Sequence, residues 1–405
     1  FQDWRSAQTD LALSSDGRYV YSGDLRHLIR WDTETGSPLL IGEPWFELTQ
    51  KGEDRTWILA VALSPDDGFA YGGLKCGRIY VSRARADDVG QPRTALRCLP
   101  AGWAGPGLDL STGDRMQFWQ ALAFTHPDDL LELAPACEEA GFEGIMLADH
   151  VFAPEHYTSR YPYDPSGEPP FDGSTPFPES FATISALSQI TTKLRFLTNV
   201  YILPLRHPIE IAKDVSTAAI FSKNRTVLGL GAGWLREEFE ILDVPFEARG
   251  RRMDEQLPII QKLLSGEVVS ADGEFYRFDA LRMNPIPTER VPMWVGGMNK
   301  AALRRAAQFG DGWTGAGTTF EQTEELLLEL RRQRERFGRE KEPFDCLIPL
   351  TEELPPEQMA RLIELGMTGT VSWPLQFQLP PGCTVKDKID KLHELGETMI
   401  KPVNG

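Results

Sequence analysis

The most constraining feature of this 405-residue chain is an alternation of apolar, strand-like runs and amphipathic helical segments that begins at Met116. Continuous apolar strands separated by helices are typical of a parallel sheet that is covered on both faces. Eight such runs within 290 residues favour a closed (β/α)8 TIM barrel over residues 116–405, because this fold usually takes about 250 residues. A doubly wound open sheet is the alternative. The eight runs are residues 116–124, 142–150, 193–200, 225–233, 292–297, 312–317, 344–350 and 368–374.

Residues 1–99 have a different, β-rich pattern. Ala12, Leu13, Ser14 and Asp16 recur fifty positions later as Ala62, Leu63, Ser64 and Asp66, and each copy is a strand, a turn and an alternating strand. Together with the dipeptide Trp31-Asp32, this repeat resembles a WD-repeat propeller blade over residues 8–90. We therefore expect a small all-β propeller-like segment that packs or docks rather than catalyses. Residues 100–115 are rich in glycine and proline and predict a linker.

Charge and composition exclude several functions. The net charge of −17 opposes binding to nucleic acid, and we find no basic stripe that would offset it. No apolar run has the length of a membrane span, and the first residues lack the layout of a signal peptide, so we expect a soluble, cytoplasmic protein without membrane contact. The five cysteines and six histidines show no metal-ligand or disulfide spacing, and the barrel has no G-x-S-x-G elbow. We expect no metal and no hydrolase chemistry by these routes.

Polar residues end the second and third barrel strands, where a barrel places its active site. Asp149 and His150 end the second strand; an imidazole there can exchange a proton near neutral pH, and a carboxylate can orient a ring. A purely structural hydrogen bond is the alternative for His150. Thr198 and Asn199 end the third strand, and they could face a flat heterocycle or simply form a turn.

Glycines end the fourth and fifth strands. Gly229, Gly231 and Gly233 alternate before Trp234, a pattern that allows a ligand close to the backbone but fails as a dinucleotide-binding fingerprint. Gly296-Gly297 precede Met298-Asn299 and a helix, whose main-chain N–H groups could hold an anionic tail.

Taken together, the barrel sequence resembles the luciferase-like monooxygenase superfamily, in particular its branch of oxidoreductases that use the deazaflavin coenzyme F420. The resemblance covers about residues 116–315, in the order of the family. The matching segments are EEAGFEGIMLADHVF, RYPYDPSGEPPFDGSTPF, LRFLTNVYILPLRHPIEIAK, VLGLGAGWLREEFEILDVPFEARGRRMDE, GEFYRFDALRMNP and PMWVGGMNKAALRRAAQFGDGW.

The resemblance implies a homodimer formed through the barrel, with the cofactor ring in the mouth. It implies that Asp149 contacts the deazaflavin, that His150 gives or takes a proton, and that a cis peptide at Asn199–Val200 supports the ring. Further contacts to the cofactor are implied for the strand ends and for the start of the following helix. These residues are Thr198, Ile202, Gly231, Ala232, Gly233, Trp234, Gly296, Gly297, Asn299 and Lys300.

One departure from the family bears on the substrate. Its sugar-phosphate dehydrogenases carry an acidic proton acceptor after the strand-four glycines, whereas this chain has Trp234, which argues against sugar-phosphate oxidation.

Residues 151–178 are expected to form a lid that excludes water. The predicted reaction is hydride exchange between coenzyme F420 and a small organic substrate, with His150 moving the proton. The alternatives are an FMN-dependent luciferase-like monooxygenase, or an inactive barrel in a propeller-type interaction protein.

Overall fold

A computed structural model of the chain describes residues 116–404 and seven strands of the part before them. The chain divides into two compact units, Phe1–Arg97 and Cys98–Gly405. In the first unit, β1 to β4 form a four-stranded antiparallel sheet and β5 to β7 form a three-stranded one. The predicted linker at 100–115 lies outside the described residues. The seven strands are Leu11–Leu13, Tyr19–Gly23, Leu28–Asp32, Pro38–Gly42, Ile58–Leu63, Phe69–Leu74 and Ile79–Arg83.

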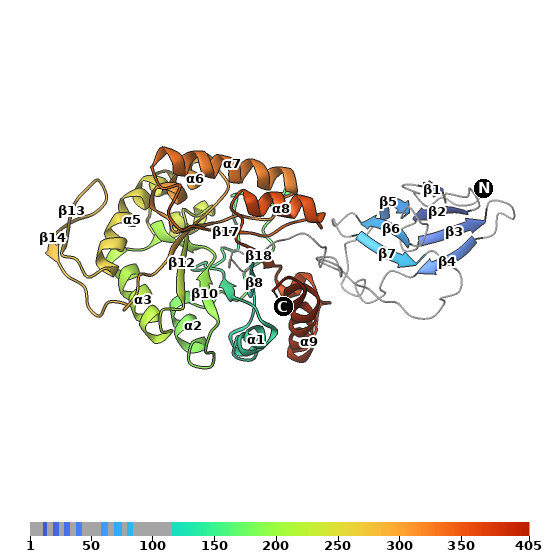
Figure 1. Cartoon of the computed structure of the whole chain (residues 1–405), viewed down its shortest axis with the longest axis horizontal. Helices are drawn as coiled ribbons and strands as arrows, with labels where there is room; N and C mark the ends of the chain where they lie inside the picture. Colours follow the sequence, from blue (N-terminus) through green and yellow to red (C-terminus); the bar gives the residue numbers. More distant parts are fainter. Residues whose placement is uncertain are drawn as a thin grey trace. The chain divides into compact units, whose positions relative to one another are not determined.

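The second unit is a closed barrel of eight parallel strands (Figure 1). The ring closes because β18 pairs with β8 at one seam while β10 pairs with β12 at the other. Each strand overlaps one of the eight apolar runs in the sequence, so the predicted TIM barrel is confirmed and the open sheet is excluded. In chain order the strands are β8 Gln117–Ala121, β9 Gly144–Leu147, β10 Arg195–Thr198, β12 Thr226–Gly231, β15 Met293–Gly296, β16 Gly312–Thr314, β17 Asp345–Ile348 and β18 Gly369–Ser372.

Helices surround the barrel, and capping side chains fix where several of them begin. His207 accepts a hydrogen bond from the N–H of Ile209, and Pro208 is the first helical residue of α3. Thr319 forms a capping box at the start of α7. The helices are α1 Pro127–Ala140, α2 Ser180–Leu187, α3 Pro208–Phe221, α4 Arg236–Ile241, α5 Arg249–Leu264, α6 Lys300–Phe309, α7 Phe320–Arg336, α8 Pro356–Glu364, α9 Val385–Leu395 and α10 Lys401–Asn404.

Two further pairings were not predicted from the sequence. The short strand β11 (Tyr201–Ile202) continues the edge of β10 and pairs with β12. An antiparallel hairpin of β13 (Val269–Asp272) and β14 (Arg277–Leu281) stands outside the ring beside α5 (Figure 1).

The barrel has two apolar layers, as expected for strands that are buried on both faces. A large layer lies between the strands and the helices. A smaller one fills the lumen, where the rings of Trp119 and Trp294 meet edge to face with their centroids 5.5 Å apart. Seven strands contribute to this inner layer, so the barrel is a packed core and its ligand-accessible region is restricted to the ends. The inner layer consists of Trp119, Met146, Leu197, Val227, Trp294, Leu347 and Val371.

In the part of the chain that the structure describes, every helix falls short of the length or the apolar character that crossing a bilayer requires.

Candidate active site at the carboxyl ends of the strands

Asp149 lies just beyond the end of β9 and is buried, with 7% of its surface exposed. Its carboxylate accepts two hydrogen bonds from the Arg206 guanidinium, at 2.7 and 2.8 Å, and one from the N–H of Ile202 at 2.8 Å. The Arg206 guanidinium also stacks on the ring of Tyr201, 4.1 Å from its centroid. Although burial opposes its charge, the adjacent Asp149 raises the pKa of Arg206. The ion pair between Asp149 and Arg206 therefore links the end of β9 to the turn after β11.

His150 is held by a buried carboxylate that the sequence did not single out. The side chain of Glu238, from α4, is fully buried. Its Oε2 lies 3.1 Å from Nδ1 of His150, while its Oε1 accepts a hydrogen bond from the N–H of Val151 at 2.6 Å. An ionised carboxylate can only accept, so the contact suits the tautomer with its proton on Nδ1, which leaves Nε2 for a ligand. The arrangement is that of an oriented proton-exchanging imidazole.

The Asn199–Val200 peptide bond is cis, which confirms the geometry that the resemblance implies. The Val200 side chain lies against two strand-end glycines. A Cβ on Gly231 would come 2.5 Å from Val200 Cγ2, and a Cβ on Gly296 would come 2.3 Å from Val200 Cγ1. These glycines therefore make room for a side chain of the protein itself. The close approach of a ligand to the backbone at Gly229, Gly231 and Gly233 stays a prediction. The half-buried Val200 forms an apolar floor across the ends of β12 and β15.

Thr198 and Asn199 have different surroundings. Thr198 is fully buried, and its hydroxyl donates to the carbonyl of Gly229 at 2.6 Å, so it joins β10 to β12. Asn199 is half-buried, and its Oδ1 accepts a hydrogen bond from the Thr314 hydroxyl at 3.3 Å. Of these two predicted contacts, the side chain of Asn199 is the one with surface left for a ligand.

The other predicted contacts fall into two groups. Ile202 is buried against Phe239, while Ala232, Gly233 and Trp234 are half-buried in the turn that leads to α4. Asn299 and Lys300 are exposed at the start of α6, where the Asn299 side chain caps the N–H of Ala302. The remaining first-turn N–H groups of α6 have no partner within the helix, and they follow the turn at Gly297, whose φ of 113° favours glycine.

An aromatic cluster covers His150. The ring centroids of Phe171, Phe177 and Trp234 lie 4.9, 5.1 and 6.0 Å from that of the imidazole. Both phenylalanines belong to the segment 151–178, which was predicted to be a lid. The segment thus supplies side chains directly over the proton-exchanging group.

The outer arm of the same segment is fastened to α4. Oε1 of Glu237 accepts from the N–H and hydroxyl of Thr158, at 2.5 and 3.0 Å, and from the N–H of Ser159 at 3.1 Å. Partial burial opposes the charge of Glu237, but these hydrogen bonds prevail and lower its pKa to about 2. The N–H of Arg236 donates in turn to the Ser159 hydroxyl at 3.0 Å.

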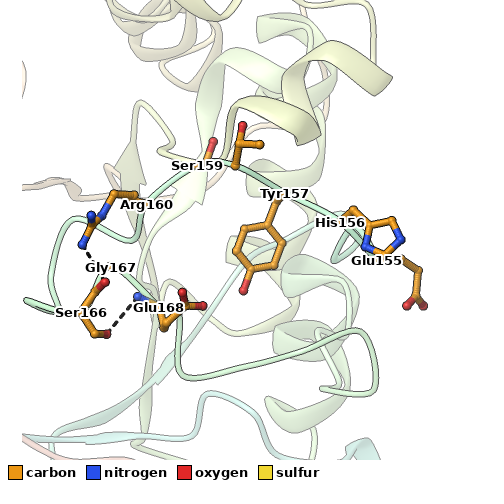
Figure 2. Close-up of a pocket in the computed structure, with 9 residues that line it drawn as sticks. Glu155, His156, Tyr157, Ser159, Arg160, Ser166, Gly167 and Glu168 are labelled. Carbon is orange, nitrogen blue, oxygen red and sulfur yellow. Dashed lines mark hydrogen bonds between the residues drawn. The ribbon is translucent and has the colours of Figure 1, made fainter.

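This arm encloses a polar hollow of about 380 Å³ (Figure 2). Its lining comes entirely from residues 155–168 and includes neither Asp149 nor His150. Figure 2 shows Arg160 turned toward Ser166, whose carbonyl oxygen accepts its hydrogen bond at 2.7 Å. The hollow is therefore a feature of the lid arm, separate from the cluster around His150.

Sequence reasoning missed Glu238, Arg206 and the phenylalanines, for identifiable reasons. Glu238 sits next to Phe239 on the inward face of α4, and an acidic residue on an apolar face was the signal available. Arg206 lies in the short connection between the turn Leu203–Leu205 and α3, where no periodicity indicates which side chain it meets. The phenylalanines come from a loop, whose path no periodicity predicts.

Comparison with known proteins agrees with the barrel assignment. The family model described as luciferase-like monooxygenase matches residues 107–351. An uncharacterized protein of Mycobacterium tuberculosis is 34% identical over 290 residues, which are 71% of this chain and 100% of that protein. The F420-dependent glucose-6-phosphate dehydrogenase of Nakamurella multipartita is 30% identical over 229 residues, 55% of this chain and 63% of that enzyme. The family match gives no support to a propeller-like fragment at 8–90, which stays a prediction.

Solved structures share the fold. The coenzyme F420-dependent tetrahydromethanopterin reductase of Methanopyrus kandleri superposes with a TM-score of 0.56 at 13% identity, over 71% of this chain and 99% of its own. An F420-dependent secondary alcohol dehydrogenase, solved with an F420-acetone adduct, gives a TM-score of 0.56 at 15% identity, over 72% and 100%. At these identities the likeness establishes the architecture of the barrel alone.

Proposed function

Because this chain belongs to the luciferase-like monooxygenase family, we propose that it is an oxidoreductase that exchanges a hydride between coenzyme F420 and a small organic substrate. The observation that carries the proposal is the His150–Glu238 pair, which stands beside Asp149 at the end of β9. Relatives that are named as F420-dependent support the choice of cofactor.

The residues at the mouth fit such a cofactor. Val200, with Gly231 and Gly296 behind it, offers an apolar floor on which a flat ring can lie. At the start of α6, the free N–H groups and the Lys300 ammonium are suited to an anionic tail, since a helix N-terminus favours negative charge. Ring and tail would thus be held by the ends of adjacent strands β12 and β15.

When bound, coenzyme F420 supplies the two-electron hydride chemistry. The protein's contribution is to hold and move a proton and to exclude water. The carboxylate of Glu238 fixes the His150 ring, so that Nε2 faces away from α4 and can take a proton from a substrate hydroxyl. In the opposite direction the imidazolium donates from Nε2, and Glu238 balances its charge. The lid places two apolar rings against the imidazole, which limits the access of water.

A cofactor titration tests the proposal. The purified full chain is titrated with coenzyme F420 and, separately, with FMN, and binding is followed by the change in cofactor fluorescence. We expect saturable binding of F420 and a clear loss of affinity when Lys300→Glu puts an anion at the start of α6. Lys341→Glu, at an exposed site beyond α7, is the matched control. Preferential binding of FMN would support a flavin monooxygenase, and binding of neither would support an inactive barrel; both results contradict the proposal.

A further inference from the structure

The surroundings of His150 are unusually apolar for a proton-exchanging group. Three aromatic rings stand within 6.0 Å of its ring centroid, those of Phe171, Phe177 and Trp234. Phe171 and Phe177 also contact each other edge to face, with centroids 5.1 Å apart. All three aromatic residues are only half-buried, so none of them is fully covered by the protein. We call His150, Phe171, Phe177, Trp234 and Phe124 the aromatic cage.

Phe124 enters the cage from beyond the end of β8, the strand that pairs with β9. Its ring lies 6.0 Å from that of Phe171 and 5.8 Å from that of Phe177. Its φ of 65° falls in the left-handed region, which costs a bulky side chain about 1–2 kcal/mol. At this backbone angle the Phe124 ring contacts both phenylalanines of the segment 151–178.

Three arginines from the loops and helices around the barrel mouth are already engaged. Arg206 is bound by both oxygens of Asp149, and Arg160 donates to the carbonyl of Ser166. Arg249 donates to the carbonyls of Gly233 and Phe246 and lies over the Phe246 ring. Burial, with smaller effects of Tyr163 and Asp164, raises the pKa of Tyr161 to about 12, so the phenol that packs on Trp234 is neutral. Apart from His150 itself, the cage thus presents neutral aromatic rings to a ligand.

Resting on the function proposed above, we propose that the substrate is a neutral, largely apolar cyclic molecule with a carbonyl group or the corresponding secondary hydroxyl, and that the aromatic cage binds its ring. In reduction, the carbonyl carbon accepts a hydride from reduced F420 and forms a C–H bond. The C=O π pair passes to the oxygen, which takes the proton from Nε2 of His150. The carbonyl is reduced by two electrons, the deazaflavin is oxidised by two, and water returns the proton to His150.

The aromatic cage also explains why a phosphorylated sugar is a poor fit. Such a substrate carries two negative charges and many hydroxyl groups, and burial of these groups without partners costs several kcal/mol. Apolar rings, in contrast, gain about 0.5–1.5 kcal/mol for each well-placed aromatic contact beyond the burial of their surface. The specificity therefore differs from the one that the names of the F420-dependent glucose-6-phosphate dehydrogenase relatives describe.

Binding of two probes to the full chain tests the inference. By calorimetry, with and without saturating coenzyme F420, we measure 1-tetralone, a neutral bicyclic ketone, and glucose 6-phosphate. We expect 1-tetralone to bind at least tenfold more tightly than glucose 6-phosphate. Phe171→Ala should raise the Kd of 1-tetralone about tenfold, whereas Phe221→Ala, at a 55% exposed ring on the end of α3, should leave it unchanged. Phe177→Ala serves as a second cage variant if Phe171→Ala does not fold.

The outcomes separate the two proposals. Tighter binding of glucose 6-phosphate, absence of 1-tetralone binding, or equal Kd values in the cage variants and in Phe221→Ala would each overturn the substrate inference. Failure of coenzyme F420 to bind would instead overturn the proposed function, because the probe measurements without cofactor report on the aromatic cage alone.

Discussion

At the scale of single residues, the most consequential contact is the one between Glu238 and His150. It places a carboxylate that is fully buried against an imidazole and a main-chain N–H. Buried polar groups that lose their partner retain the full cost of desolvation. Glu238 consequently supports both the position of His150 and the start of the lid at Val151.

Glu238→Ala should lower the free energy of unfolding by about 2–4 kcal/mol, because it leaves the His150 ring and the Val151 N–H without their acceptor. Denaturation in urea, followed by tryptophan fluorescence, measures the loss. Glu240→Ala is the matched control on the same helix: its carboxylate is exposed and lies 3.8 Å from Arg236, so a change within about 0.5 kcal/mol is expected. Equal losses of unfolding free energy in the two variants would show that the buried contact of Glu238 stabilises the fold no more than an exposed carboxylate does.

Gly229→Ala should lower the free energy of unfolding by more than the small volume of the added methyl group suggests. A Cβ at this position would lie 1.9 Å from the carbonyl oxygen of Thr198, so β10 and β12 would have to separate. We expect a loss of about 3 kcal/mol or more in the free energy of unfolding. In Gly173→Ala the new Cβ would lie 3.5 Å from a Glu155 oxygen, and we expect a change within about 0.5 kcal/mol. A Gly229→Ala protein with the thermal midpoint of Gly173→Ala would contradict this account.

At the scale of elements, α4 acts as the anchor of the lid. Glu238 holds its first residue, and Glu237 holds Thr158 and Ser159 on the outer arm. The two neighbouring carboxylates thus fasten two points of a segment that has no regular secondary structure of its own. Because the aromatic cage depends on where this segment lies, α4 positions the cage as well.

The attachment of the lid to Glu237 should depend on pH in a defined window. The pKa of Glu237 is lowered from 4.5 to about 2, so its stabilising contribution is complete above about pH 4.5 and is lost as the pH falls toward 2. Glu237→Gln reproduces the uncharged state at neutral pH. In this variant, amide exchange at Thr158 and Ser159 should be about tenfold faster at pH 7, since hydrogen bonds to a charged acceptor are the stronger ones.

Hydrogen exchange with mass spectrometry of peptides from residues 155–168 makes this measurement. Glu240→Gln, on the same helix but without contact to the lid, should leave the exchange of these peptides unchanged. An unchanged rate in Glu237→Gln would show that the lid is held by its aromatic contacts rather than by the carboxylate.

At the scale of the whole molecule, the barrel closes with strands that all lie between Gln117 and Ser372. Since β8 pairs with β18 on one side and β9 on the other, no strand from the preceding unit is needed to complete the ring. The relative from Mycobacterium tuberculosis aligns over its entire length with 71% of this chain, which agrees with a barrel that is sufficient by itself.

A protein of residues 116–405 should therefore fold and bind coenzyme F420 with the affinity of the full chain. Circular dichroism and the fluorescence titration measure the two properties. A fragment that is unfolded, or that binds more than about tenfold more weakly, would show that residues 1–115 contribute to the barrel. The predicted homodimer is testable on the same two proteins by sedimentation equilibrium, and both should be dimeric if the barrel forms the interface.

What the sequence determined by itself follows from local physical chemistry. The period of the apolar residues separated strands from helices, the number of strand–helix units predicted a closed barrel, and the position of Asp149 and His150 after a strand placed them at its mouth.

The tertiary structure alone decided which groups act on these residues. Glu238 is 88 positions from His150, and Arg206 is 57 positions from Asp149. Val200 packs against Gly231 and Gly296, and the aromatic cage draws on a loop and on the segment that follows β8. Local periodicity carries no information about such long-range contacts, because they depend on the closure of the ring and on the path of a loop across it.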